Sequence, residues 1–201
     1  MAIFVFAHGA GAGPETEFMQ IISANLEQKG HKVHRFAFPY WQKIEQSGKK
    51  RPPDKKEVLD AAFIAEVTRI QEGCEDIPLV VMGKSMGARV AFRCADKVNA
   101  VAAIGLGFPF HPPGKPEKHR LADLTNGRRR NFIVQGSRDP FGKPEWLAEQ
   151  ALPKNLRLHW VTDGNHDLAQ PKRNGLTNTE CWQLVSREID AFVTKLTNQI
   201  N

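Results

Sequence analysis

Short apolar runs alternate with longer amphipathic stretches along the whole chain, and this alternation restricts the fold more than any other feature of the sequence. Brief apolar runs are typical of strands buried on both faces, and the stretches between them have helical spacing. Such alternation predicts the α/β class: a doubly wound parallel sheet covered on both faces by right-handed crossovers. The expected strands are Ile3–Ala7, Lys32–Phe38, Leu79–Met82, Ala100–Leu106, Asn131–Gln135 and Leu156–Val161. The expected helices are Thr16–Lys29, Lys55–Glu72, Met86–Val98, Pro144–Ala151 and Thr179–Leu196.

The composition predicts one globular domain that covers residues 1–201. Hydrophobic residues make up 41% of the chain and charged residues 25%, as in ordinary soluble proteins. No apolar run approaches the length of a membrane span, and Met1–Ala7 lacks a basic leader, so we expect a cytoplasmic protein without membrane contact. Three cysteines without metal-ligand spacing indicate reduced thiols.

The net charge of +6 raises the question of nucleic-acid binding. The basic clusters Lys49–Arg51, Lys55–Lys56 and Arg128–Arg130 are scattered through loop-like segments and lack interleaved aromatic residues. No zinc-ligand spacing or nucleic-acid-binding motif accompanies them. We therefore interpret them as solvated surface charge and expect no nucleic-acid partner.

The motif Gly83-Lys84-Ser85-Met86-Gly87 lies between a predicted buried strand and a predicted helix. A serine in G-x-S-x-G at such a junction occupies a sharp turn that exposes its hydroxyl at the edge of a sheet. Glycines are needed because strand and helix approach closely there, and a Cβ at either flanking position would clash. The motif makes Ser85 a candidate nucleophile.

A serine nucleophile needs a base and a third group that orients the base. Asp139 and His166 each follow a different predicted strand, and the order Ser85, Asp139, His166 is that of α/β-hydrolases. In a parallel sheet these strand ends meet at one edge. We therefore expect His166 as the base and Asp139 as its partner, with Asp163 as the fallback acid. We expect His8 to orient the glycine-rich loop that it begins, and His31, His34 and His159 to be structural. His111 and His119 are expected at the surface, where either could contact substrate.

Acyl transfer also needs backbone donors that stabilise the oxyanion. The N–H of Met86 is one candidate, and the glycine-rich loop His8–Gly13 supplies the second, for which we choose the N–H of Ala10. Aromatic residues at the strand ends suggest a partly apolar pocket. The expected substrate-contacting residues are His8, Gly9, Gly11, Tyr40, Trp41 and Phe108.

Two phosphate-binding interpretations of the glycine-rich segments fail on spacing. Lys84-Ser85 resembles the end of a P-loop, but the required upstream glycine is missing and Pro78 stands there. Gly9, Gly11 and Gly13 are followed by Pro14, and no acidic residue ends the second predicted strand, so a dinucleotide site is not supported. We expect no metal and no organic cofactor.

Together, His-Gly-Ala-Gly-Ala-Gly, Gly-Lys-Ser-Met-Gly-Ala-Arg, Gly-Ser-Arg-Asp-Pro-Phe and Gly-Asn-His-Asp resemble a small bacterial α/β-hydrolase of the dienelactone-hydrolase-like branch. The resemblance covers nearly the whole chain but begins at what would be the family's third strand. It implies six parallel strands in the order second, first, third, fourth, fifth, sixth. Some relatives serve as scaffold or regulatory modules, so it implies the fold more firmly than an activity.

The sequence thus predicts a serine hydrolase that cleaves a small carboxylic ester or thioester, active as a monomer or homodimer. The alternative is a non-catalytic interaction or regulatory module with the same fold. Two segments, Trp41–Asp54 and Phe108–Lys118, contain glycines and prolines and are expected to be irregular and to border the pocket, where either could form a short flap.

Overall fold

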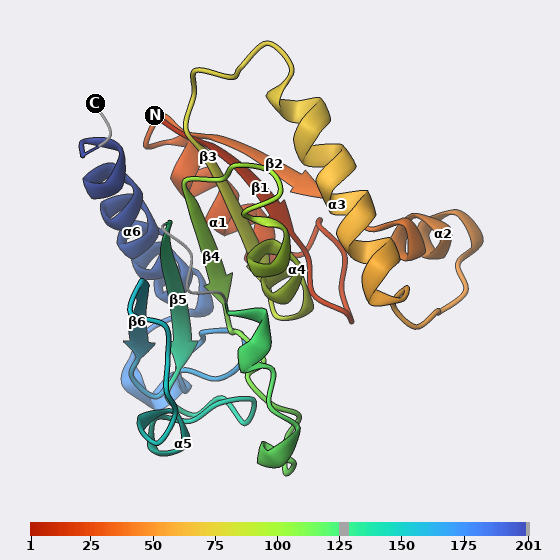
Figure 1. Ribbon diagram of the computed structural model, residues 1–201. Coiled ribbons are helices and arrows are strands. Elements are labelled where there is room, and N and C mark those ends of the chain that lie inside the picture. The colour runs from red at the N-terminus through yellow and green to blue at the C-terminus, as the bar shows by residue number, and fades with distance from the viewer. Residues whose placement is uncertain (125–128, 200–201) are drawn as a thin grey trace.

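A six-stranded parallel sheet forms the centre of the protein, with strand order β2-β1-β3-β4-β5-β6 (Figure 1). The computed structural model describes residues 1–124 and 129–199. The order confirms the one implied by the sequence resemblance. The strands are β1 (Ile3–Ala7), β2 (Lys32–Phe36), β3 (Leu79–Lys84), β4 (Ala102–Leu106), β5 (Arg130–Gly136) and β6 (Leu156–Val161).

Helices cover both faces of the sheet, as predicted. On one face, apolar side chains of α1 and α6 form a core with alternate residues of the central strands. On the other face, α3 and α4 pack against the remaining residues of the same strands (Figure 1). The helices are α1 (Glu17–Glu27), α2 (Pro39–Ser47), α3 (Lys56–Gln71), α4 (Met86–Cys94), α5 (Pro144–Ala148) and α6 (Asn178–Thr197).

The two helices on the first of these faces, α1 and α6, begin at side-chain caps. The hydroxyl of Thr16 accepts a hydrogen bond from the N–H of Met19 at the start of α1. At the start of α6, Thr177 and Glu180 satisfy each other's backbone N–H groups in a capping box. These caps explain why the two helices begin within a few residues of the predicted positions.

The segment Trp41–Asp54 is not wholly irregular as predicted, because its first half, Trp41–Ser47, belongs to α2. Pro39 occupies the first turn of this helix, and Gly48 ends it in a left-handed conformation at φ 66°. The proline-rich segment Phe108–Lys118 does lack an α-helix and contains only a short 3-10 turn at Pro116–Lys118.

The carboxyl ends of the central strands lie in register, which places their following loops at one edge of the sheet. Ala7 pairs with Gly83, and Lys84 pairs with Leu106. β1, β3 and β4 are buried along their whole length, since neighbours and helices cover them on every side. The loops after these strands therefore project from a rigid base.

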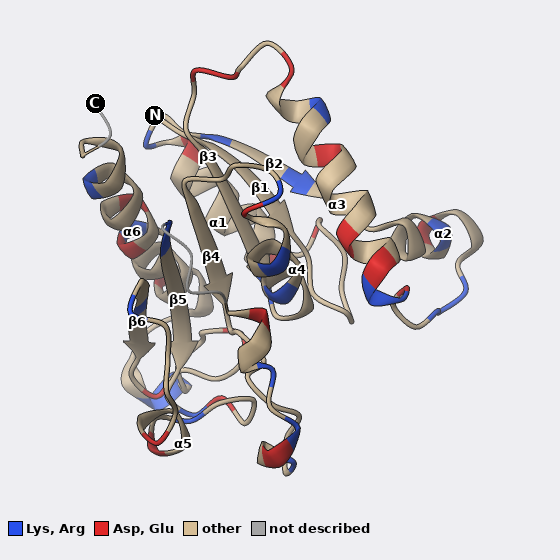
Figure 2. Cartoon of the chain, viewed as in Figure 1, with Lys and Arg blue, Asp and Glu red and all other residues tan. Residues whose placement is uncertain are grey.

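The basic residues are spread over separate elements (Figure 2). Lys49–Arg51 and Lys55–Lys56 are exposed, but Arg129 is buried and forms an ion pair with Asp96, so the interpretation as solvated charge is wrong for this arginine. Arg128 of the same cluster lies outside the described residues. Across the described ranges, no helix combines the length and the apolar character that crossing a bilayer requires.

Candidate active site

Ser85 occupies a strained turn between β3 and α4. Its backbone has φ 53° and ψ −113°, a combination that a non-glycine residue adopts at a cost of about 1–3 kcal/mol. The serine N–H donates to the Leu106 carbonyl at 3.0 Å, which ties the turn to the end of β4. A Cβ on Gly83 would collide with the backbone of Gly87, and one on Gly87 would collide with the carbonyls of Ala7 and His8. The clash predicted at both glycines is therefore confirmed.

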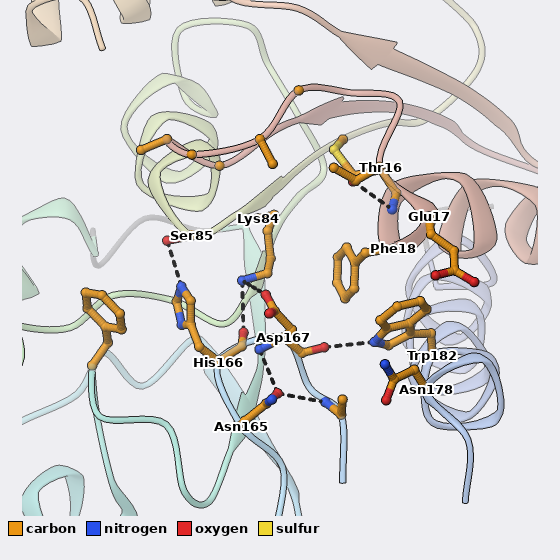
Figure 3. Close-up of a pocket in the computed structure, with 18 of the residues that line it drawn as sticks. Thr16, Glu17, Phe18, Lys84, Ser85, Asn165, His166, Asp167, Asn178 and Trp182 are labelled. Atoms are coloured by element: carbon orange, nitrogen blue, oxygen red, sulfur yellow. Dashed lines mark hydrogen bonds and ion pairs between the residues drawn. The ribbon is translucent and has the colours of Figure 1, made fainter. Parts of the chain in front are cut away.

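The structure brings Ser85, His166 and Asp139 into one hydrogen-bonded chain. The Nε2 atom of His166 lies 2.9 Å from the Ser85 hydroxyl (Figure 3). Its Nδ1 atom lies 2.8 Å from Oδ2 of Asp139. An ionised carboxylate can only accept, so Nδ1 carries the proton and Nε2 accepts from the serine. This tautomer is the one in which His166 can remove the serine proton.

Asp139 is fully buried and is held by three donors. Besides His166, its oxygens accept from the Gln135 amide at 2.8 Å and from the N–H of Phe141 at 2.9 Å. These donors fix the orientation of the carboxylate toward the imidazole. The fallback acid, Asp163, instead accepts from Asn174 at 3.2 Å.

The loop after β1 contributes Gly9, Ala10 and Gly11 to the cavity in front of Ser85. Within residues 1–124 and 129–199, the backbone N–H groups of Ala10 and Met86 donate to no acceptor. Both residues line the space around the serine hydroxyl. They are therefore available as donors to an oxygen that develops negative charge there.

His8 and Tyr40 lie behind this loop and not in the cavity, so their expected substrate contact is wrong. The expected position of His8 against the loop is confirmed. His8 is fully buried, and its Nδ1 bonds the Gly9 carbonyl at 2.7 Å while its Nε2 accepts from the N–H of Phe38 at 3.1 Å. Burial lowers the pKa of His8, so the ring stays neutral and can hold both bonds. The Tyr40 hydroxyl donates to the carbonyls of Gly9 and Ala10 at 3.2 and 3.1 Å. Both side chains support the loop that carries Ala10.

Phe108 and Trp41 also differ from their expected place in the pocket. Phe108 is fully buried and packs edge to face against Phe92 in the core. Trp41 lies on α2, where its indole packs so closely on Gly13 that a Cβ there would collide with the ring. In a sheet covered on both faces, aromatic residues just after a strand also face the helix layers, where burial of their area is favourable.

Lys84 is a site residue that the sequence motif alone did not assign. Its ammonium donates to the backbone carbonyl of His166 at 2.9 Å and forms an ion pair with Asp167 at 3.2 Å (Figure 3). Burial lowers its pKa, and the charge of Asp167 opposes that shift. Lys84 therefore ties the loop that carries the histidine to the strand that carries the serine. The one sequence feature that could have placed Lys84 at the site is its position directly before Ser85.

Two further contacts hold His166 in place, one made by Phe141 and one by the backbone of its neighbour Asp167. The ring of Phe141 packs on the imidazole with centroids 4.4 Å apart. The carbonyl of Asp167 accepts from the indole N–H of Trp182 at 2.8 Å, which anchors the histidine loop to α6.

In the described parts of the chain, His, Cys, Asp and Glu side chains form no group of three or more that could hold a metal ion.

The sheet order, the strained serine and the order Ser…Asp…His together define an α/β-hydrolase fold. The chain belongs to this family: residues 1–194 match the Alpha/beta hydrolase domain. The family match confirms the resemblance to an α/β-hydrolase that the sequence motifs indicated. A comparison with curated proteins gave no match.

Several solved structures share the fold. A dienelactone hydrolase from Anabaena variabilis is 17% identical with a TM-score of 0.70, over 93% of this chain and 84% of that one. An alpha-beta serine hydrolase homologue from Coxiella burnetii is 16% identical with a TM-score of 0.69, over the same shares of the two chains. Est1E from Butyrivibrio proteoclasticus is 14% identical with a TM-score of 0.70, over 98% of this chain and 88% of that one.

Proposed function

We propose that the protein is a serine hydrolase that cleaves small carboxylic esters or thioesters through an acyl-enzyme. The observation that carries the proposal is the hydrogen-bonded chain from Ser85 through His166 to Asp139. It meets the geometric requirement for a nucleophile, a base and an orienting acid. Membership of the α/β-hydrolase family and the fold shared with a dienelactone hydrolase support the same chemistry.

In the acylation step, His166 takes the proton of Ser85 as the serine oxygen attacks the substrate carbonyl carbon. Asp139 stabilises the imidazolium that forms, and the N–H groups of Ala10 and Met86 donate to the oxyanion. The C–O or C–S bond then breaks, and His166 passes its proton to the departing alcohol or thiol. The product of this step is an ester between Ser85 and the acyl group.

In the deacylation step, His166 takes a proton from water while the water oxygen attacks the acyl carbon. The same two N–H groups hold the second oxyanion, and the proton returns to the Ser85 oxygen as the carboxylic acid is released. Each cycle uses one water and returns the enzyme unchanged, so the reaction needs no metal or organic cofactor.

A fluorophosphonate probe tests the nucleophile directly. Wild-type protein should be labelled at Ser85, and Ser85→Ala should abolish the label. A buried serine outside the site, Ser186, provides the matched control variant Ser186→Ala. A wild-type protein that takes no label would favour the non-catalytic interaction module, and a label that survives Ser85→Ala would exclude Ser85 as the nucleophile.

A panel of p-nitrophenyl esters with increasing acyl length tests the substrate class. Hydrolysis should depend on Ser85 and show a preferred acyl length. Zero turnover across esters and thioesters, with labelling intact, would move the proposal to another acyl bond such as a peptide bond. A small-molecule substrate, the cytoplasmic location and the monomeric or dimeric state remain predictions.

A further inference from the structure

Two cavities meet at Ser85. A larger one of about 680 Å³ is lined by the glycine-rich loop, Phe18, Trp182 and the histidine loop. A smaller one of about 390 Å³ lies on the other side, next to α4 and the ends of the two proline-containing segments. Ala10, Ser85 and Phe141 line both cavities. A carbonyl carbon at Ser85 therefore has one cavity for each of its two substituents.

The position of His166 assigns the cavities. The base must return its proton to the leaving oxygen or sulfur, so the leaving group lies next to the imidazole. His166 lines the larger cavity and is absent from the lining of the smaller one. The leaving group therefore occupies the larger cavity, and the acyl group occupies the smaller one beside Met86.

Three arginines line the smaller cavity, and two of them are already neutralised. Arg89 donates to Asp123 at 2.6 Å. Arg93 forms an ion pair with Asp60 and approaches Asp123 at 3.5 Å. These bonds connect α3, α4 and the short turn Leu121–Asp123, so both arginines serve a structural ion-pair network.

Arg120 is different, because its guanidinium has no acidic partner among the described residues. Within the described residues, its guanidinium makes one hydrogen bond, to the Pro109 carbonyl at 3.0 Å. A guanidinium has five N–H donors, so several of them are available to a ligand. Burial lowers the pKa of Arg120, the charge of Arg89 lowers it further, and the charge of Asp123 opposes the shift. Asp123 itself pairs with Arg89 and Arg93. Figure 2 shows the basic residues of α4 and of the segment between β4 and β5 in the same part of the molecule.

The other charged residues at the smaller cavity do not cancel the positive charge of Arg120. Lys56 lines this cavity as a further cation, and Asp54 is the one carboxylate among its lining residues in the described chain. One oxygen of Asp54 is buried without a hydrogen-bond partner among the described residues. Burial raises the pKa of Tyr40, and the charge of Asp54 raises it further. No ion pair joins Asp54 to Arg120 within the described residues.

We propose that the smaller cavity is an acyl-group subsite for carboxylates, and that the protein hydrolyses monoesters of short dicarboxylic acids. The inference rests on the proposed function. The free carboxylate of the acyl group binds Arg120, and the neutral alcohol lies in the larger cavity. Hydrolysis consumes one water and gives the dicarboxylate, the alcohol and one proton.

Monobenzyl esters of butanedioic, pentanedioic and hexanedioic acid test the subsite against neutral benzyl esters of the same acyl lengths. One of the anionic esters should have a kcat/KM about 10- to 100-fold above its neutral counterpart, because charge-assisted bidentate bonds to a guanidinium are strong. Arg120→Gln should reduce that ratio to about one, and Arg120→Lys should keep part of it. Arg157→Gln, at an arginine outside both cavities, is the charge-matched control and should leave the ratio as in the wild type.

An ester with its carboxylate on the alcohol, 4-(acetoxymethyl)benzoate, tests the orientation. It should show no advantage over benzyl acetate, and Arg120→Gln should not alter the ratio of the two. Ser85-dependent hydrolysis without a preference for the anionic acyl group, or a preference that survives Arg120→Gln in a protein with wild-type circular dichroism, overturns the subsite alone. Absence of turnover together with absence of fluorophosphonate labelling overturns the proposed function as well.

Discussion

The two sides of Ser85 are prepared for different partners. On the base side, defined by Asp139, His166 and Lys84, each polar group already has a protein partner at 2.8–3.2 Å. On the oxyanion side, defined by the backbone of Ala10 and Met86, the N–H groups have no acceptor within the described residues. A base must be oriented before the reaction begins, whereas oxyanion donors must be vacant for an oxygen that only the substrate brings.

The sharpest way to break the base side is Asp139→Asn. An amide in place of the carboxylate favours the wrong tautomer of His166, and kcat should fall by about 10⁴-fold. Initial rates on an ester substrate measure this effect. Asp163→Asn is the matched control, since Asp163 bonds Asn174 and not the imidazole. An equal loss in both variants would show that Asp139 is not the specific partner.

Ala10→Pro tests the oxyanion side by removing one N–H. The loss of one such donor lowers kcat by about 10²- to 10³-fold, so this change should be severe but smaller than the loss of Asp139. Ala10→Gly keeps the N–H and should retain most of the rate. Steady-state kinetics on the same ester compare the two variants. Equal losses would indicate that the side chain of Ala10 matters, and not its donor.

Lys84→Met tests whether the base side depends on its tether. Without the ammonium, the carbonyl of His166 and the carboxylate of Asp167 lose their shared donor, and a small displacement of the imidazole should lower kcat by about 10- to 100-fold. KM should change little, and Lys84→Arg should recover part of kcat. A variant that is merely unfolded would lose its thermal transition, which calorimetry detects.

The smallest expected effect concerns the support of the oxyanion loop and its response to pH. The pKa of His8 lies below 6.5 in the folded protein and at its ordinary 6.5 in the unfolded chain. Between these two pKa values the unfolded chain binds more protons than the folded protein does. The free energy of unfolding should therefore fall as the pH decreases from 6.5 toward the folded pKa. Above pH 6.5 the contribution of His8 to stability should be fully present. Thermal melts at several pH values should show a shallower loss in His8→Gln than in the wild type. If the melting temperatures of the two proteins changed with pH in parallel, His8 would not be the source of the pH dependence.

The strands and the triad could be predicted from the sequence because both depend on local patterns. Buried parallel strands are continuous apolar runs. Ser85 directly follows β3, and Asp139 and His166 lie in the loops after β5 and β6. The helix α2 was missed, although Pro39 and Gly48 mark its two ends, because the prolines and glycine of the segment suggested a loop.

Apart from His8, the supporting residues could not be predicted, because their roles depend on packing between distant segments. Tyr40 reaches the Gly9 carbonyl across 31 positions of the chain, and Lys84 reaches the His166 carbonyl across 82. A strand end is close to both the site and the helix layers, so position alone does not tell a substrate contact from a support. The ion pairs of Arg89 and Arg93 depend in the same way on α3 and on Asp123.

Gly87 joins the two sides of the site. Its α-carbon lies so near the carbonyls of Ala7 and His8 that no side chain fits between them. The distance between Ser85 and the loop that carries Ala10 is thus set by a contact between backbone atoms, on which side-chain substitutions have little influence. The residues that surround the two cavities can therefore be substituted while the distance between Ser85 and the backbone of Ala10 stays the same.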